Sequence, residues 1–305
     1  MHGQFSWYDL MTPDSAAAKK FYPSVTGWST EEWDKGDYSM WTAGGVPFGG
    51  MNPISPEQTA QGIPPHWLAY VTVDDIGRAA EKVKALGGRV MHEEDIPDVG
   101  RFAIIQDPQG AMLAIIKSST PSPGWDGTPS LGRFSWHELM TTDYRAAFDF
   151  YHQLFGWEKT GEMDMGPAGM YLTYGMKGKM FGGIYNREKE RANVPPAWLF
   201  YANVKDVDKA AAAAKKAGGQ IIVEPMEVPG GDRIAIGIDV QGAHFAVHQT
   251  KPKSAAAASK AQAKKRAKAK AKPKAKAAAK KQSKPKAKRR AKARPKKVAR
   301  RTKRR

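Results

Sequence analysis

The octapeptide FSWYDLMT at residues 5–12 returns almost unchanged as FSWHELMT at residues 134–141. Other matches follow in the same order: Phe-Tyr, Gly-Trp, Phe-Gly-Gly and Pro-Pro-x-Trp-Leu-x-Tyr each occur in both copies. The offset between the copies is 129 residues at the start and 131 later, so only small insertions separate them. Such a period has the length of a domain, not of a short solenoid repeat. The sequence therefore predicts two tandem copies of one domain.

The segment between the copies is rich in Ser, Pro and Gly, which is typical of an exposed linker. We expect the first domain at residues 4–118, the linker at 119–132 and the second domain at 133–250. Residues 251–305 differ sharply in composition and form a separate tail.

Both halves of each copy show one order of elements: a strand, a helix and further strands. In copy one, Asp14 is expected to cap a helix over residues 15–22 that Pro23 ends, and Asp75 is expected to cap a second helix. The clearest strands are expected at residues 5–11, 37–42, 46–51, 66–73, 89–92, 101–106 and 112–116. The predicted fold class is α+β, in which two strand-helix-strand-strand-strand modules per domain form one curled, cup-shaped sheet.

This order resembles the vicinal oxygen chelate superfamily, which includes glyoxalase I, extradiol dioxygenases and bleomycin-resistance proteins. The shared features are the first strand, the Asp-capped helix ending in Phe-Tyr, and the Gly-Trp pair that follows. The sequence DPQG at residues 107–110 is similar to the superfamily's closing motif, and DVQG at residues 239–242 is a weaker version. The resemblance covers about residues 4–250 and implies that a ligand binds inside the cup.

Metalloenzymes of that superfamily carry a His on the first strand of each half and a Glu on a closing strand. In this chain, the corresponding positions fall on Trp7, Trp67, Ala114, Trp136, Trp198 and Ala246. Because Trp and Ala offer no lone pair to a metal, we expect neither a metal nor another cofactor. A shift of one residue would bring in His66 and His137 on what we expect to be the opposite face, so a metal-dependent mechanism stays open as an alternative.

The cup is then expected to be aromatic. We expect four indoles and two carboxylates to bind a small apolar or aromatic molecule there: Trp7, Asp9, Trp67, Trp136, Glu138 and Trp198. By the period of two along a strand, each carboxylate shares a face with the Trp of its own octapeptide. Two alternatives stay open, because Trp also commonly fills a core and a carboxylate is equally satisfied at an interface between the copies.

The sequence shows no Gly-rich phosphate loop, nucleophile elbow or catalytic triad. If chemistry occurs, the candidate residues are Glu138, His244 and His248, since each His can act as an acid or base near neutral pH. Copy one has Met112 and Ile116 at the two His positions, so copy two is favoured. A purely structural role for both His residues remains the alternative.

The charged residues are distributed unevenly along the chain. Residues 1–250 hold 22 Lys and Arg against 30 Asp and Glu, whereas residues 251–305 hold 27 Lys and Arg and no acid, so the net charges are −8 and +27. Without aromatic residues the tail is expected to be disordered and to bind DNA or RNA without sequence specificity, and it has no apolar face for a membrane. The expected contacts include Lys264, Lys265, Arg266, Lys288, Arg289, Arg290, Arg300, Arg301, Arg304 and Arg305.

The chain has no Cys, which excludes disulfides, and shows neither a signal peptide nor a membrane span, so we expect a cytoplasmic, nucleoid-associated protein. The leading hypothesis is a metal-free small-molecule-binding protein, similar to glyoxalases and bleomycin-resistance proteins and tethered to nucleic acid by its tail. The alternatives are an enzyme of the superfamily (a lyase, a dioxygenase or a hydroxylase-like catalyst) and an architectural protein of the nucleoid.

Overall fold

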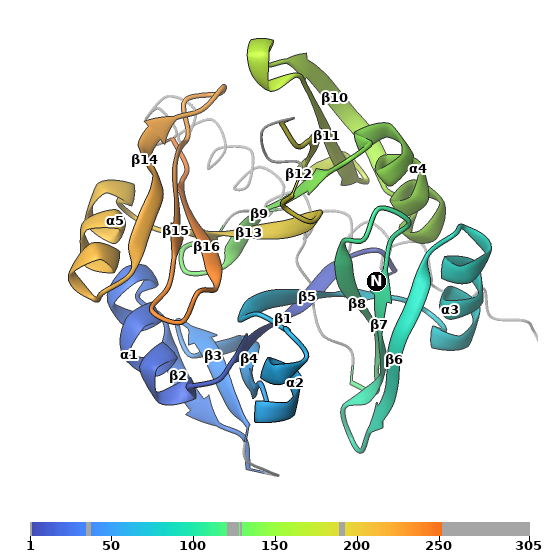
Figure 1. Cartoon of the computed structure of the whole chain (residues 1–305), viewed down its shortest axis with the longest axis horizontal. Coiled ribbons are helices and arrows are strands. Elements are labelled where there is room, and N and C mark those ends of the chain that lie inside the picture. Colours follow the sequence, from blue (N-terminus) through green and yellow to red (C-terminus); the bar gives the residue numbers. More distant parts are fainter. Residues whose placement is uncertain (1, 35–37, 121–127, 129, 189–192, 252–305) are drawn as a thin grey trace, which may run out of the picture. The chain divides into compact units, whose positions relative to one another are not determined.

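The computed structural model describes residues 2–34, 38–120, 128, 130–188 and 193–251 (Figure 1). Apart from Lys251, the tail predicted at residues 251–305 lies outside the described residues, and so do all its proposed nucleic-acid contacts. None of the helices in the described part of the chain is long and apolar enough to cross a membrane.

Copy one forms one mixed eight-stranded sheet in the order β2-β3-β4-β1-β5-β8-β7-β6. Its elements are β1 (Phe5–Thr12), α1 (Ser15–Thr26), β2 (Ser29–Glu32), β3 (Ser39–Ala43), β4 (Val46–Pro53), α2 (Pro56–Ala60), β5 (His66–Thr72), α3 (Ile76–Ala85), β6 (Arg89–Ile96), β7 (Gly100–Gln106) and β8 (Met112–Ser118). The two modules meet where β1 and β5 pair antiparallel. In Figure 1 the sheet bends about this central pair.

Copy two repeats the arrangement in the order β10-β11-β12-β9-β13-β16-β15-β14. Its elements are β9 (Phe134–Thr141), α4 (Tyr144–Phe155), β10 (Glu158–Asp164), a short 3-10 helix (Gly166–Ala168), β11 (Met170–Met176), β12 (Lys179–Asn186), β13 (Ala197–Asn203), α5 (Val207–Lys216), β14 (Gln220–Glu227), β15 (Arg233–Ile238) and β16 (His244–Gln249). The strand orders of the copies correspond element by element, which confirms the predicted duplication of a strand-helix-strand-strand-strand pair.

Helix α1 corrects one sequence prediction. Asp14 caps it as expected, since its carboxylate accepts from the Ala17 N–H at 2.9 Å, but the helix does not end at Pro23 and runs to Thr26. Proline removes the bond that its missing N–H would have made and crowds the preceding turn, but the helix continues for three residues beyond it. The next turn is closed by Gly27, whose left-handed φ of 74° lets its N–H reach the Pro23 carbonyl at 3.0 Å. Strand β2 follows this turn. It completes the four strands of the first module, and the sequence did not predict it.

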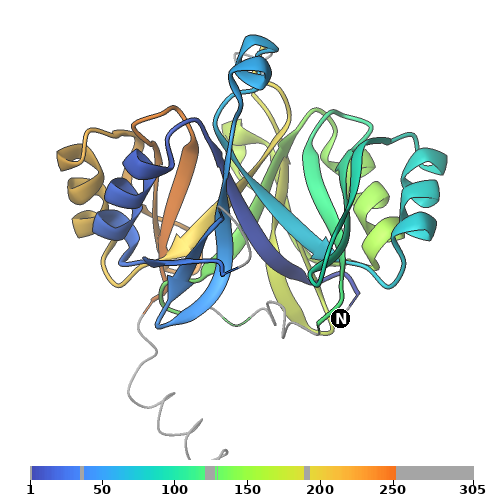
Figure 2. The ribbon, with the colours of Figure 1, turned by 90° about the horizontal axis from the view of Figure 1, so that it is seen from below.

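The two copies pack through the helix-bearing faces of their sheets. Helix α1 contacts α5 and α3 contacts α4, so each helix pair joins the two copies (Figure 2). One apolar core contains residues of both sheets and four of the helices. We call the face of each sheet that points into this shared core the inner face, and the opposite face the outer face. By period two, successive residues of a strand alternate between them.

A buried tyrosine–histidine pair lies at the centre of the inner faces. The Tyr8 hydroxyl and His137 Nε2 are 2.6 Å apart, and the Phe5 ring stacks on the imidazole with centroids 3.8 Å apart. His137 Nδ1 lies 3.1 Å from the Phe181 carbonyl, which can only accept, so Nδ1 carries the proton and Nε2 accepts from Tyr8. Burial lowers the pKa of His137 to about 3, which keeps the ring neutral.

The motifs that identify each copy also bind it to the other copy. The Tyr22 hydroxyl donates to Asp239 Oδ2 at 3.0 Å, and the Tyr151 hydroxyl donates to Asp107 Oδ2 at the same distance. These aspartates begin the two closing motifs, and Oδ1 of each accepts backbone N–H groups within its own loop. The aspartate therefore shapes its loop with one oxygen and joins the copies with the other.

The Gly-Trp pairs make a second reciprocal contact. Trp28 Nε1 donates to the Gly132 carbonyl and Trp157 Nε1 donates to the Gly3 carbonyl, both at 2.7 Å. Each indole thus satisfies a backbone group just before the first strand of the other copy. Since buried polar groups must be paired, these bonds fix how the copies dock.

Replacing Tyr151 with Phe tests the cross-copy bond. The change leaves Asp107 Oδ2 and Trp198 Nε1 without the hydroxyl that each contacts, at 3.0 and 3.2 Å. We expect the free energy of unfolding to fall by about 1–3 kcal/mol, measured by urea titration at neutral pH. Tyr144→Phe is the matched control, because the partner of Tyr144, Glu162, keeps its contact with Lys159. Equal losses in the two variants would contradict the structural role of the cross-copy bond.

Candidate functional site

Copy one places a carboxylate on its outer face that is saturated with donors. Asp9 Oδ1 accepts from the Tyr38 hydroxyl at 2.5 Å and Trp7 Nε1 at 2.9 Å. Oδ2 accepts from Asn52 Nδ2 at 2.8 Å and the Tyr70 hydroxyl at 2.9 Å. Burial raises the pKa of Asp9, and the hydrogen bonds from Tyr38, Tyr70, Trp7 and Asn52 oppose that rise.

Apolar side chains close the rest of this face. Leu68, Tyr70, Phe102 and Ala114 are buried together, and Trp7, Ile96, Ile104, Met112 and Ile116 pack against them. The carboxylate of Asp9 lies under this cover and is only 4% exposed. The outer face of copy one is therefore a small second core.

Copy two has the same carboxylate with fewer partners. The Tyr171 hydroxyl donates to Glu138 Oε2 at 2.6 Å, and the Tyr201 hydroxyl donates to Oε1 at 2.9 Å. Trp136 Nε1 donates to the Tyr171 hydroxyl at 2.9 Å and not to the carboxylate. Burial raises the pKa of Glu138, and the two tyrosine bonds oppose the rise. Glu138, Trp136 and Tyr171 are all partly exposed.

The repeated Phe-Gly-Gly motif makes room for these tyrosines. A Cβ on Gly50 would lie 1.9 Å from the Tyr38 hydroxyl, and a Cβ on Gly183 would lie 2.1 Å from Tyr171 Cζ. In both copies the ring thus crosses the strand where the second glycine has no side chain. The first glycine of each motif lies against the backbone of the first strand, for example Gly182 against the His137 carbonyl. The Phe-Gly-Gly motif thus gives the tyrosine rings the space to reach the carboxylates. The sequence alone showed only that the motif is repeated.

The structure places two of the predicted tryptophans on the same face as the predicted carboxylates. Trp7 and Trp136 lie on the outer faces with Asp9 and Glu138, as period two predicted, so neither carboxylate lies at the interface between the copies. Sequence analysis missed the partners Tyr38, Asn52, Tyr70, Tyr171 and Tyr201. A signal for two of them was present, because Tyr70 and Tyr201 end the repeated Pro-Pro-x-Trp-Leu-x-Tyr segment.

The prediction that Trp67 and Trp198 point into the cup, on the same face as Trp7 and Trp136, is wrong. Both indoles point into the shared core. Trp67 pairs with the inner-face residue Leu10 across β1 and β5, and its Nε1 donates to the Tyr22 hydroxyl at 2.9 Å. Trp198 likewise contacts Tyr151 in the shared core. Counting along one strand did not give the pairing between strands, and a shift by an odd number of residues reverses the face.

The one-residue alternative does not assemble a His site either. His66 pairs with Met11 on the outer face, contrary to the expectation that the shift would turn it away, and its Nδ1 contacts the Pro64 carbonyl at 2.7 Å. His137 lies on the inner face against Tyr8. The two imidazoles thus occupy different copies and opposite faces.

The candidate residues His244 and His248 lie on the outer face on either side of Ala246. His244 is exposed. His248 is buried between Ser135 Oγ, 2.7 Å from its Nδ1, and Asp232 Oδ2, 3.0 Å from its Nε2. Burial lowers the pKa of His248, while Asp232 opposes this. Although the three side chains resemble a triad in type, Ser135 is only 2% exposed, and its hydroxyl contacts the Tyr201 carbonyl as well as His248.

A family model matches both copies, at residues 4–115 and 133–246. The chain belongs to the glyoxalase, bleomycin resistance protein and dioxygenase superfamily. It is 35% identical over 256 residues to "Putative glyoxylase CFP32" of Mycobacterium tuberculosis, covering 82% of this chain and 96% of that protein. It is 28% identical over 273 residues to the anthracycline biosynthesis protein DnrV of Streptomyces peucetius, covering 85% and 98%.

Solved structures show the same fold at low identity. The 2,2',3-trihydroxybiphenyl 1,2-dioxygenase of Sphingomonas wittichii strain RW1 matches with a TM-score of 0.60 and 13% identity, over 82% of this chain and 91% of that chain. The Mn(II)-bound glyoxalase of Novosphingobium aromaticivorans matches with a TM-score of 0.55 and 14% identity, over 81% and 82%. These likenesses establish the fold of this superfamily member.

The residues do not fit the metal that enzymes of this superfamily bind. In copy one, the paired outer-face residues on β1, β5 and β8 are Trp7, Tyr70 and Ala114. In copy two they are Trp136, Tyr201 and Ala246. Within the described ranges, no group of three or more His, Cys, Asp or Glu could hold a metal ion. Indole and methyl groups cannot replace imidazole or carboxylate ligands.

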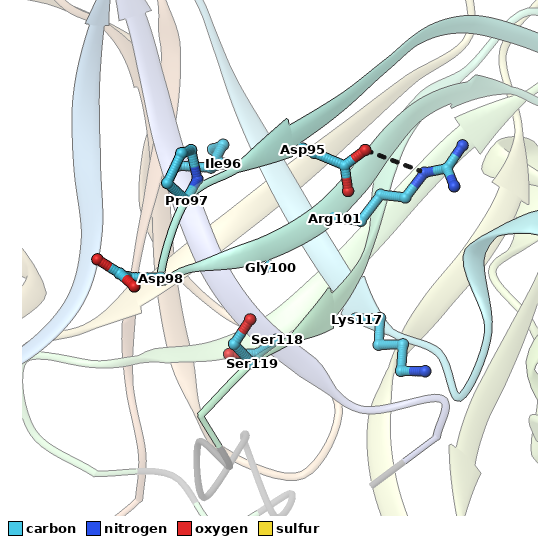
Figure 3. A pocket seen from close by; sticks show the side chains of 9 residues that line it. All are labelled: Asp95, Ile96, Pro97, Asp98, Gly100, Arg101, Lys117, Ser118 and Ser119. Atoms are coloured by element: carbon cyan, nitrogen blue, oxygen red, sulfur yellow. Dashed lines mark ion pairs between the residues drawn. The ribbon is translucent and has the colours of Figure 1, made fainter.

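A surface hollow of about 410 Å³ lies elsewhere, at the turn between β6 and β7 and the end of β8 (Figure 3). It is lined by Asp95, Ile96, Pro97, Asp98, Gly100, Arg101, Lys117, Ser118 and Ser119. Its paired charges, Arg101 Nε and Asp95 Oδ2, are 4.0 Å apart and exposed. It contains none of the predicted site residues, and exposed ion pairs of this kind are weak.

The difference in hydrogen bonding between Asp9 and Glu138 should appear as a difference in how far each substitution lowers the free energy of unfolding. Asp9→Asn keeps one acceptor oxygen but sets an NH₂ group against donors, so we expect a loss of about 1–3 kcal/mol in the free energy of unfolding. Glu138→Gln is the matched change in the partly exposed site, where solvent can satisfy the amide, and should cost about 1 kcal/mol or less. Urea titration of both variants at neutral pH gives the comparison. A larger loss for Glu138→Gln than for Asp9→Asn would contradict the assignment.

Proposed function

We propose that this chain is a metal-free protein of the superfamily that binds a small aromatic or apolar molecule on the outer face of its sheet. The carrying observation is that a carboxylate held by tyrosine hydroxyls lies near a partly exposed indole, Trp136, at a position that the resemblance assigns to a metal ligand. A small-molecule site commonly combines such an apolar, aromatic lining with a few fixed polar groups. Glu138, Tyr171, Tyr201 and Trp136 form this combination in copy two.

The relatives support an aromatic ligand. DnrV is named as an anthracycline biosynthesis protein, and anthracyclines are polycyclic aromatic compounds. The alternative, an enzyme, is favoured by the name of CFP32 and by the exposed His244, which could exchange protons near neutral pH. Metal content and the response to a chelator discriminate between metal-free binding and a metal-dependent reaction.

The first test uses purified full-length protein and naphthol. We expect naphthol to quench tryptophan fluorescence equally with and without EDTA, and elemental analysis to find less than one equivalent of Fe, Mn, Zn or Ni per chain. Trp136→Leu should weaken binding by about 2- to 10-fold, the equivalent of one aromatic contact of about 0.5–1.5 kcal/mol. Loss of naphthol binding in EDTA, together with one metal ion per domain in the purified protein, would contradict the metal-free proposal and favour the metal-dependent alternative.

We also propose that residues 251–305 tether the protein to nucleic acid. The support is the charge partition: the tail carries +27 and the rest of the chain −8, so phosphate attracts the former and repels the latter. The absence of aromatic residues from the tail argues for backbone contacts without base stacking. In this proposal the tail sets where in the cytoplasm the ligand-binding part accumulates, at the nucleoid or on RNA.

Truncation after Thr250 tests the tether. The intact chain should retard duplex DNA of any sequence, and the truncated chain should not. If about eight cations engage phosphates, a plot of log affinity against log salt concentration should have a slope of about −7. Matching RNA and DNA probes distinguish the two polymers. Retardation that survives truncation, or that ignores salt, would refute the tether and leave the ligand proposal intact.

A further inference from the structure

The two carboxylates differ in how much of their acceptor capacity the protein uses. A carboxylate offers about four acceptor positions. Asp9 accepts four side-chain contacts, one of them from Trp7 Nε1, whose single N–H is shared with the Tyr38 hydroxyl at 2.8 Å. Glu138 accepts two side-chain bonds, one on each oxygen, from the described part of the chain. No described Lys or Arg forms an ion pair with Glu138. Each Glu138 oxygen thus has one acceptor position for a ligand.

One residue difference between the copies replaces a side chain that donates to the carboxylate with an aromatic side chain. Asn52 pairs with Met11 in copy one, and Tyr185 pairs with Met140 in copy two, so they hold equivalent positions. Asn52 donates to the carboxylate, whereas the Tyr185 ring stacks on Tyr171 with centroids 5.9 Å apart. Glu138 therefore lies among four aromatic side chains: Trp136, Tyr171, Tyr185 and Tyr201.

The outer face of copy two is also more accessible. Leu68 and Phe102, which cover this face in copy one, are 3% and 7% exposed. The equivalent residues of copy two, Leu199 and Ile234, are only half-buried. Leu199, which pairs directly with Glu138, thus offers a partly exposed apolar surface beside the carboxylate, whereas Leu68 beside Asp9 is covered.

We infer that copy two, and not copy one, binds an organic ammonium ion, with its N–H groups on the two open positions of Glu138 and its apolar part over Leu199. This inference rests on the proposed ligand-binding function and specifies the ligand's charge. A partly buried carboxylate is stabilised by a counter-ion. Aromatic faces attract a cation as well, most strongly when it is desolvated.

His244 marks the position two strands away from Glu138 on this face. It lies in the same row of the sheet as Glu138, because Leu199 pairs with Glu138 and β13 pairs in parallel with β16. Two strand spacings, about 10 Å, separate the two positions. An ammonium ion with one ring attached spans from Glu138 across Leu199 toward this exposed imidazole.

The test compares two molecules with one apolar body: phenethylammonium and phenethyl alcohol. Each is titrated into the full-length chain at neutral pH, and tryptophan quenching and isothermal calorimetry report affinity and stoichiometry. We expect one phenethylammonium per chain, bound at least about tenfold more tightly than the alcohol. Glu138→Gln, which keeps size but removes charge, should abolish this preference, and Asp9→Asn should retain it. Near-UV circular dichroism verifies that both variants are folded.

The other outcomes separate this inference from the broader proposal. Equal binding of the alcohol and the ammonium would overturn the cation inference while supporting an apolar ligand site. Binding of neither probe, or a preference that survives Glu138→Gln, would also overturn it, and the naphthol titration then decides the proposed function by itself. Two cations per chain, with one lost in Asp9→Asn, would refute the assignment to copy two alone.

Discussion

Each closing-loop aspartate accepts a hydrogen bond from a tyrosine of the other copy, and this reciprocal contact determines which face of each sheet stays available. Asp107 and Tyr151 form one bond, and Asp239 and Tyr22 form the other. Since both tyrosines lie on helices that cover the sheets, the helix-bearing faces must meet. A large aromatic core then fills the space between them, with the neutral His137 at its centre. The outer faces lie outside this shared core.

The outer faces share one design, in which a carboxylate on the first strand is held by tyrosines from neighbouring strands. The design depends on the second glycine of the Phe-Gly-Gly motif, which lets Tyr38 or Tyr171 cross the strand. Without these hydroxyl groups, a carboxylate in such a setting would be costly, because burial disfavours its charge. Tyrosine hydroxyls thus stabilise a carboxylate on the outer face of each copy.

Duplication let the two copies diverge at this site while the interface stayed equivalent. Copy one has a fourth donor, Asn52, and a large apolar cover that includes Phe102. Copy two has Tyr185 and Ile234 at those positions and keeps Glu138 partly exposed. Filling one site contributes stability to the whole compact unit of residues 1–251. The other site keeps a partly exposed carboxylate, and it is there that we propose ligand binding.

The sequence by itself determined the duplication, the order of elements, the capping aspartates and the common face of each carboxylate with its neighbouring tryptophan. These features are local, since they depend on repeat spacing, helix capping and the alternation of side chains along one strand. Only the tertiary structure decided that Trp67 and Trp198 point inward, that Tyr38 and Tyr171 reach the carboxylates, and that Asp9 is saturated while Glu138 is not. These outcomes depend on pairing between strands and on space left by distant glycines, which no pattern within a single strand contains.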